Sequence, residues 1–161
     1  MSDARFEDAD PSARPLRLKA EGEDDLAAIS ALVQDAVGQV GEIHWAKTKQ
    51  RLVIVLHRFR WEDREAADRE GRPYERVQSA LTVQNVLAVR ARGLQPTESE
   101  TVFAVLALRW APGAEDAGGT LTVTVAGDGE IAAEVEALEV ILADVSRPWA
   151  AKARKAPDHG V

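Results

Sequence analysis

With 161 residues, the chain is long enough for one domain with a substantial core and does not require a second. It contains no cysteine, which excludes disulfides and thiolate metal ligands. Its formal net charge of −7 disfavours nucleic-acid binding unless basic side chains gather on one face.

The apolar runs of the sequence are short. They fall far below the roughly 20 residues that span a bilayer, and residues 1–12 lack the apolar stretch of an export signal. We therefore expect a soluble, cytoplasmic protein without a membrane role. Residues 1–14 are acidic and broken by Pro11, and residues 151–161 are polar, so we predict a disordered arm, a single domain over residues 15–150 and a mobile tail.

The first folded elements are expected to be a short strand and a helix. Leu16 and Leu18 alternate with basic residues, which favours a strand. Acidic residues 23–25 then precede an apolar stripe at helical spacing that continues to Val37, and this predicts an amphipathic helix with acids at its positive end. Leu32 stands in the middle of the stripe and is expected to be fully buried.

Beyond Gly41 the apolar period changes from helical spacing to two, which indicates strands. The predicted strands cover residues 40–45, 51–59, 74–83, 86–90, 101–110 and 120–125, with a further strand after the turn at residues 127–129. Residues 137–145 fit a helix and a strand equally well. The pattern predicts an α+β fold, in which one N-terminal amphipathic helix packs on a bent, mostly antiparallel sheet of six or seven strands.

Residues with catalytic chemistry are sparse. Neither His44 nor His57 has a neighbour at a metal-ligand spacing, and no nucleophile or orienting carboxylate stands beside His57. The sequence has no phosphate-binding loop and no dinucleotide fingerprint. We expect no catalytic residue, no metal and no cofactor.

The densest polar cluster combines arginine with aromatic residues. It runs through Arg58-Phe59-Arg60-Trp61-Glu62 and continues at Arg72-Pro73-Tyr74-Glu75-Arg76. Such residues carry most of the binding energy at protein interfaces, and they can also hold an anion. The candidate binding residues are His57, Arg58, Arg60, Trp61, Tyr74 and Arg76. The other interpretation is structural, with arginine–glutamate pairs closing the end of a strand.

These two stretches, together with residues 85–90 and 129–136, resemble an uncharacterised family of short bacterial proteins catalogued as a domain of unknown function. The resemblance implies one domain and transfers no activity, ligand or catalytic residue.

The sequence favours a non-enzymatic binding or protein-interaction domain that uses this cluster. Basic residues concentrate between positions 47 and 76 and acidic residues between positions 98 and 144, so the partner is expected to be another protein or a second copy. The alternative is an enzyme of unknown type that acts on a small anionic substrate held by the arginines.

Overall fold

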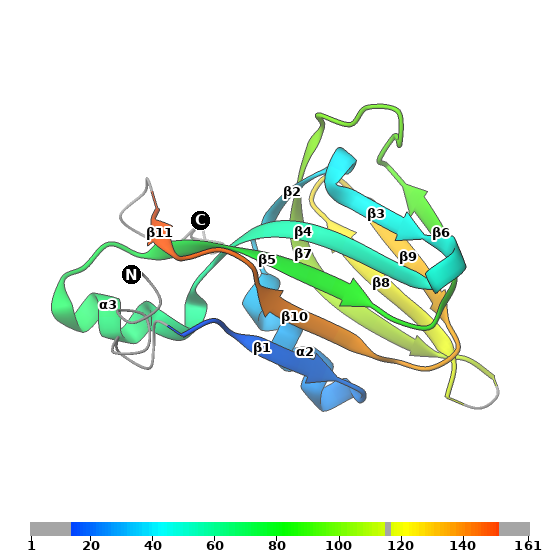
Figure 1. The fold of residues 1–161 in the computed structure, drawn as a ribbon, viewed down its shortest axis with the longest axis horizontal. Coiled ribbons are helices and arrows are strands. Elements are labelled where there is room, and N and C mark those ends of the chain that lie inside the picture. Colours follow the sequence, from blue (N-terminus) through cyan, green and yellow to red (C-terminus); the bar gives the residue numbers. More distant parts are fainter. Residues whose placement is uncertain (1–13, 115–116, 152–161) are drawn as a thin grey trace.

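Segments with alternating apolar side chains form most of the regular secondary structure of the described residues as strands (Figure 1). The structure is a computed structural model that describes residues 14–114 and 117–151. The strands are β1 (Arg17–Ala20), β2 (Val37–Gln39), β3 (Ile43–Ala46), β4 (Arg51–Phe59), β5 (Glu75–Val83), β6 (Val86–Arg92), β7 (Val102–Pro112), β8 (Gly119–Val125), β9 (Gly129–Val135), β10 (Val140–Asp144) and β11 (Trp149–Ala150). The α-helices are α2 (Glu23–Val33) and α3 (Arg64–Glu70), and the single 3-10 turns are η2 (Val40–Glu42), η3 (Lys47–Lys49) and η4 (Trp61–Asp63).

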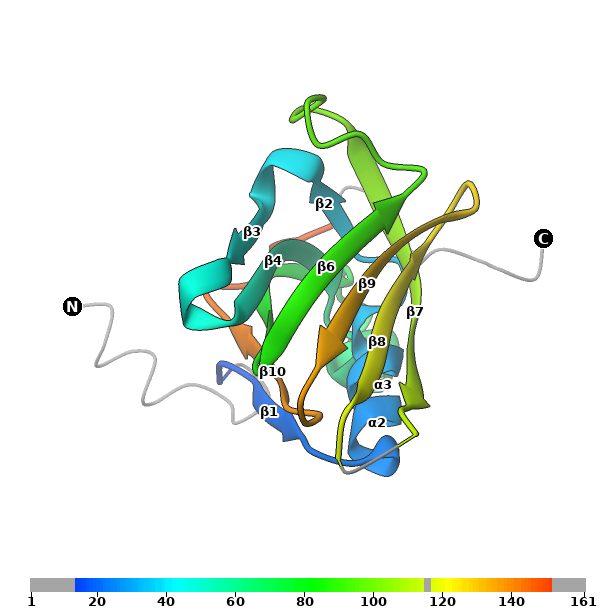
Figure 2. The same cartoon turned by 90° about the vertical axis from the view of Figure 1, so that its right-hand side faces the viewer.

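All strand pairs of this sheet are antiparallel, and the strand order is β1-β10-β5-β4-β2-β7-β8-β9-β6. Two further short strands join it, β3 on β4 and β11 on β5. The sheet curls so that its two halves face each other, with α2 between them at one end (Figure 2). Strand β3 and the terminal strand β6 consequently approach each other at the opposite end of the curl.

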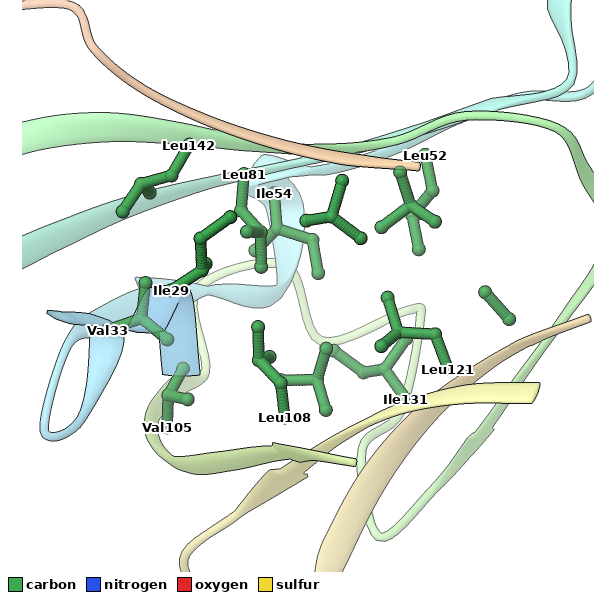
Figure 3. Close-up of a cluster of buried hydrophobic side chains, with 14 of the residues drawn as sticks. Ile29, Val33, Leu52, Ile54, Leu81, Val105, Leu108, Leu121, Ile131 and Leu142 are labelled. Carbon is green, nitrogen blue, oxygen red and sulfur yellow. The ribbon is translucent and has the colours of Figure 1, made fainter. Parts of the chain in front are cut away.

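The inner face of this curled sheet carries the core (Figure 3). Leu52, Ile54 and Leu56 of β4 are fully buried, because alternate residues of a strand point to the same side. The opposite wall presents Leu121 and Ile131 to the same interior. Helix α2 closes the space between the walls with its buried residues Leu26, Ile29 and Val33.

The coarse prediction of a mostly antiparallel sheet with few helices is confirmed, whereas its count of six or seven strands is too low. The described residues form eleven strands. Two of the strands that the prediction missed, β2 and β11, are only three and two residues long. Strands this short show no periodicity of their own. Residues 137–145, which fitted two templates, include strand β10, and this strand pairs with both β1 and β5.

The predicted N-terminal amphipathic helix is also corrected. Strand β1 precedes α2, and a second helix, α3, is present. The exposed side of α2 carries Ala27, Ala28 and Ala31, so the two faces of the helix differ little in hydrophobicity. The helix ends at Val33 rather than Val37, because Asp35 takes a left-handed conformation with φ of 66°. Val37 then pairs with Ala104 and His57, so strand pairing overrides the local helical spacing. Leu32 is partly buried and not fully buried as expected.

None of the helices in the described ranges is long and apolar enough to cross a membrane. The predicted arm and tail fall almost wholly on residues 1–13 and 152–161, which lie outside the described residues.

The buried side of α2 provides a test of this packing. Ile29→Ala is expected to lower the free energy of unfolding by about 2 to 5 kcal/mol, because it leaves a cavity among fully buried side chains. Leu32→Ala is the matched control, and it should cost clearly less because Leu32 keeps part of its surface in solvent. Urea denaturation of both variants measures the difference, and equal losses would contradict the assigned helix face.

Candidate functional site

Arg58 lies at the end of the apolar row of β4 that faces the core. It follows Leu56 at the two-residue spacing of the strand, so its side chain continues the buried row and is 0% exposed. Its Nε donates a hydrogen bond to Ser79 Oγ at 3.0 Å. Both terminal nitrogens donate to the carboxylate of Glu62 at 2.9 Å, and Nη2 also donates to Asp144 Oδ1 at 3.0 Å.

This set of contacts keeps the buried guanidinium charged. Burial alone lowers the pKa of Arg58, but the hydrogen bonds and charges of Glu62 and Asp144 outweigh burial and hold the pKa above its ordinary value. These partners come from η4, directly after β4, and from β10, 86 positions along the chain, so the interaction holds both elements against β4. Arg58 therefore serves the fold, and its donors are occupied by groups of the protein itself.

Arg60 is the second buried arginine, with 6% of its surface exposed. Its Nη1 donates to Glu75 and lies 3.6 Å from Asp63 Oδ2. Asp63 is also buried, and it accepts two hydrogen bonds from Arg72, at 2.9 and 3.2 Å. The hydrogen bond to Asp63, followed by that to Glu70, raises the pKa of Arg72 above its usual value. These ion pairs hold η4, α3 and the start of β5 together.

The opposite side of β4 carries a different group of residues, which reaches solvent. His57 contacts Trp149 of β11 edge to face, with 5.5 Å between the ring centroids. The Arg76 guanidinium lies 4.0 Å from the centroid of Phe59 and donates from Nη1 to the His57 carbonyl at 3.0 Å. Burial lowers the pKa of Arg76, and the charge of Asp35 opposes this shift. Trp149 keeps 40% of its surface exposed.

The two remaining candidates border this group. The Trp61 ring lies 5.6 Å from that of Phe59, and its Nε1 donates to the Gln34 carbonyl at 3.1 Å. Tyr74 donates its hydroxyl hydrogen to Asp68, and this hydrogen bond, aided by burial, raises the pKa of the phenol. Both side chains are only partly exposed.

The structure thus divides the six predicted site residues into two sets. Arg58 and Arg60, two of the candidate binding residues, are buried in ion pairs and do not share a surface with the other four. His57 and Arg76 share the outer side of β4 and β5, with Trp61 and Tyr74 at its border. Trp149, which the sequence analysis did not single out, completes the group. Its only sequence signal is a tryptophan directly after Pro148, just before the polar tail.

Strand register places further basic side chains on this outer side. We call it the cationic sheet face and define it by Arg17, Lys19, Val37, His44, Arg51, Val53, Val55, His57, Arg76, Gln78, Ala80, Thr82, Ile141, Ala143 and Trp149. Its centre is formed by small apolar residues, and its border carries arginine, lysine and histidine. No aspartate or glutamate is among these register positions. In Figure 1, β4, β5 and β10 lie side by side with no helix in front of them.

Four carboxylates near this face interact with its basic side chains, and one of them, Asp35, acts on Arg76. Glu21 and Glu139 lie 3.6 and 3.7 Å from the ammonium group of Lys19, and Glu42 accepts a hydrogen bond from His44 at 3.2 Å. In the described ranges, no three His, Asp or Glu side chains are placed to hold a metal ion.

The buried arginine cluster provides a test of its structural role. Arg58→Met is expected to cost about 3 to 5 kcal/mol of unfolding free energy, because it leaves the carboxylate of Asp144 buried without its cation. Arg90→Met is the control, since Arg90 pairs with Glu134 in solvent and such exposed pairs contribute about 0 to 1 kcal/mol. Urea denaturation measures the free energy of unfolding of both variants. Similar decreases would show that the buried Arg58–Asp144 pair stabilises the fold no more than an exposed ion pair does.

Comparison with known proteins yields one family. A family model described as "Protein of unknown function (DUF2948)" matches residues 16–159, which confirms the resemblance that the sequence indicated; a bacterial origin stays a prediction. The searches of curated proteins and of solved structures found no match.

Proposed function

We propose that this chain, which belongs to the DUF2948 family of proteins of unknown function, is a non-enzymatic protein-interaction domain that docks an acidic protein partner on its cationic sheet face. The observation that carries the proposal is the charge of this face. The whole chain has a formal net charge of −7, yet the side chains assigned to the face include four arginines or lysines and no carboxylate. A protein surface with acidic residues around an apolar centre complements it.

The aromatic and arginine residues of the face have the chemistry of interface anchors. Tryptophan and arginine dominate the binding energy at protein interfaces, above all where their neighbours already fix their positions. Trp149 is held by its contact with His57, and Arg76 is held over the ring of Phe59. Docking onto such fixed side chains loses little conformational entropy.

The alternative of an enzyme acting on a small anionic substrate has less support. It requires free guanidinium groups, and the donors of Arg58 face Glu62, Asp144 and Ser79. Arg60 is surrounded by the carboxylates of Glu75 and Asp63, which would repel an anion. The cytoplasm is the compartment we propose, on the grounds of the sequence alone.

Selection from a random peptide library tests the proposed function. The immobilised full chain should enrich peptides in which Asp or Glu flank aliphatic residues, because these match the border and the centre of the face. The double variant Arg76→Gln/Trp149→Ala should lose at least about tenfold in affinity for the enriched peptides, which is the usual scale for removing an anchor.

Arg109→Gln is the matched control, because Arg109 is exposed on β7, two strands from β4 in the sheet order. It should bind the same peptides as the unchanged chain. Circular dichroism confirms that each variant is folded. Peptides without an acidic bias, or peptides that bind the double variant equally well, would overturn the proposal.

A further inference from the structure

Side chains of β3 and β6 line a pocket at one end of the curled sheet. Figure 2 shows the position of these two strands. The pocket has a volume of about 310 Å³. Its lining residues are all apolar, namely Val40, Ile43, Trp45, Val89, Ala91, Leu94, Pro96 and Ile131. It lies on the inner side of the sheet, away from the cationic sheet face, because Ile43 and Trp45 point inward whereas His44 between them points outward.

The pocket is lined by three separate segments of the chain, residues 40–45, residues 89–96 and Ile131 of β9. Trp45 of β3 pairs with Leu52 of the core, and Ala91 of β6 pairs with Ile131, which forms the floor. Val40 of η2 and two residues that follow β6, Leu94 and Pro96, complete the lining. The buried positions of Val40 and Ile131 make the pocket continuous with the hydrophobic core.

Hydrogen bonds fix the shape of the pocket in the absence of any ligand. The backbone N–H of Val40 donates to Thr101 at 2.9 Å, and that of Gly41 donates to Ser99 at 2.8 Å, so the loop between β6 and β7 is tied to η2. At the other end, the N–H of Val86 donates to Gln50 at 2.8 Å and joins the start of β6 to the turn after β3. Ligand sites are usually formed in advance in this manner.

We propose that this pocket is a binding site for one small, uncharged, apolar molecule of one or two rings. Its volume lies near the lower end of the roughly 300 to 1,000 Å³ that small-molecule sites occupy. None of the described side chains that line the pocket is charged, so a charged group inside it would gain no ion pair in exchange for the hydration it loses. The ring of Trp45 offers a flat surface for an aromatic ligand.

An extended peptide is a poorer occupant of the same space. Every residue of a peptide brings a backbone N–H and a C=O that need hydrogen-bond partners, and a lining of apolar side chains leaves those that enter the pocket unsatisfied. Leu94 and Pro96 add only apolar side chains to the lining on the side of the loop.

Dye titration of the full chain tests the proposal. N-phenyl-1-naphthylamine is uncharged, and its fluorescence rises in apolar surroundings; it should bind at one saturable site. The dye 8-anilinonaphthalene-1-sulfonate has the same skeleton with an added sulfonate, and it should bind at least about tenfold more weakly because the pocket provides no cation.

Two tryptophan substitutions on β6 locate the site. Ala91→Trp fills the pocket and should abolish dye binding, whereas Ala88→Trp lies on the other side of the strand, in register with Glu134, and should leave it unchanged. Thermal melting checks that both variants are folded. If Ala91→Trp does not fold, Ala91→Leu replaces it and must lower the affinity for the uncharged dye by about tenfold.

The remaining outcomes each decide the proposal. Absence of saturable binding, equal affinity for the sulfonated dye, or unchanged binding to the filled variant would overturn it. The same holds if a peptide displaces the dye from the site while small aromatic compounds do not. The double variant Arg76→Gln/Trp149→Ala alters the cationic sheet face and not the pocket, so it should bind the dye as tightly as the unchanged chain. The dye titration therefore tests the pocket independently of the peptide selection.

Discussion

The buried Arg58 guanidinium is the constraint on which the arrangement of β4, β5 and β10 depends. A cation without access to solvent is tolerated only when charged partners replace its hydration. Glu62 follows it closely in the chain, whereas Asp144 lies 86 positions away and reaches it only if β10 packs against β5. Alternative registers of these strands would leave at least one of the charges buried alone, so we regard the cluster as a device that selects this register.

The same cluster explains how an acidic chain comes to have a cationic sheet face. Asp144, Glu62, Asp63 and Glu75 are all engaged by buried arginines on the inner side or at the end of the strands. With these carboxylates paired to buried arginines, the alternation of the strands leaves basic and small apolar side chains on the outside. Charge segregation across the sheet is thus a consequence of the buried ion pairs.

How far the sequence predicts this structure depends on the range over which each interaction acts. Strands such as β4 and β8 follow from their own alternation, and the position of Arg58 on the same side as Leu56 can be read from the spacing alone. Its pairing with Asp144 cannot be inferred from the sequence, because no local pattern links residues on β4 and β10. The end of α2 was misplaced for a related reason, since Val37 joins the sheet through pairing with β4 and β7. The pocket also escapes sequence analysis, because it is lined by three segments that are contiguous only in space.

Strands β3 and β4 connect the two proposed binding surfaces without merging them. Ile43 and Trp45 line the pocket on the inner side, and His44 and Val53, which pair with each other, belong to the cationic sheet face on the outer side. A ligand in the pocket and a protein on the face would therefore contact alternate residues of the same strand pair. Because a strand directs neighbouring side chains to opposite sides, the two can be bound at once without steric conflict. One route for coupling between them is the position of β3, which in the described structure pairs only with β4.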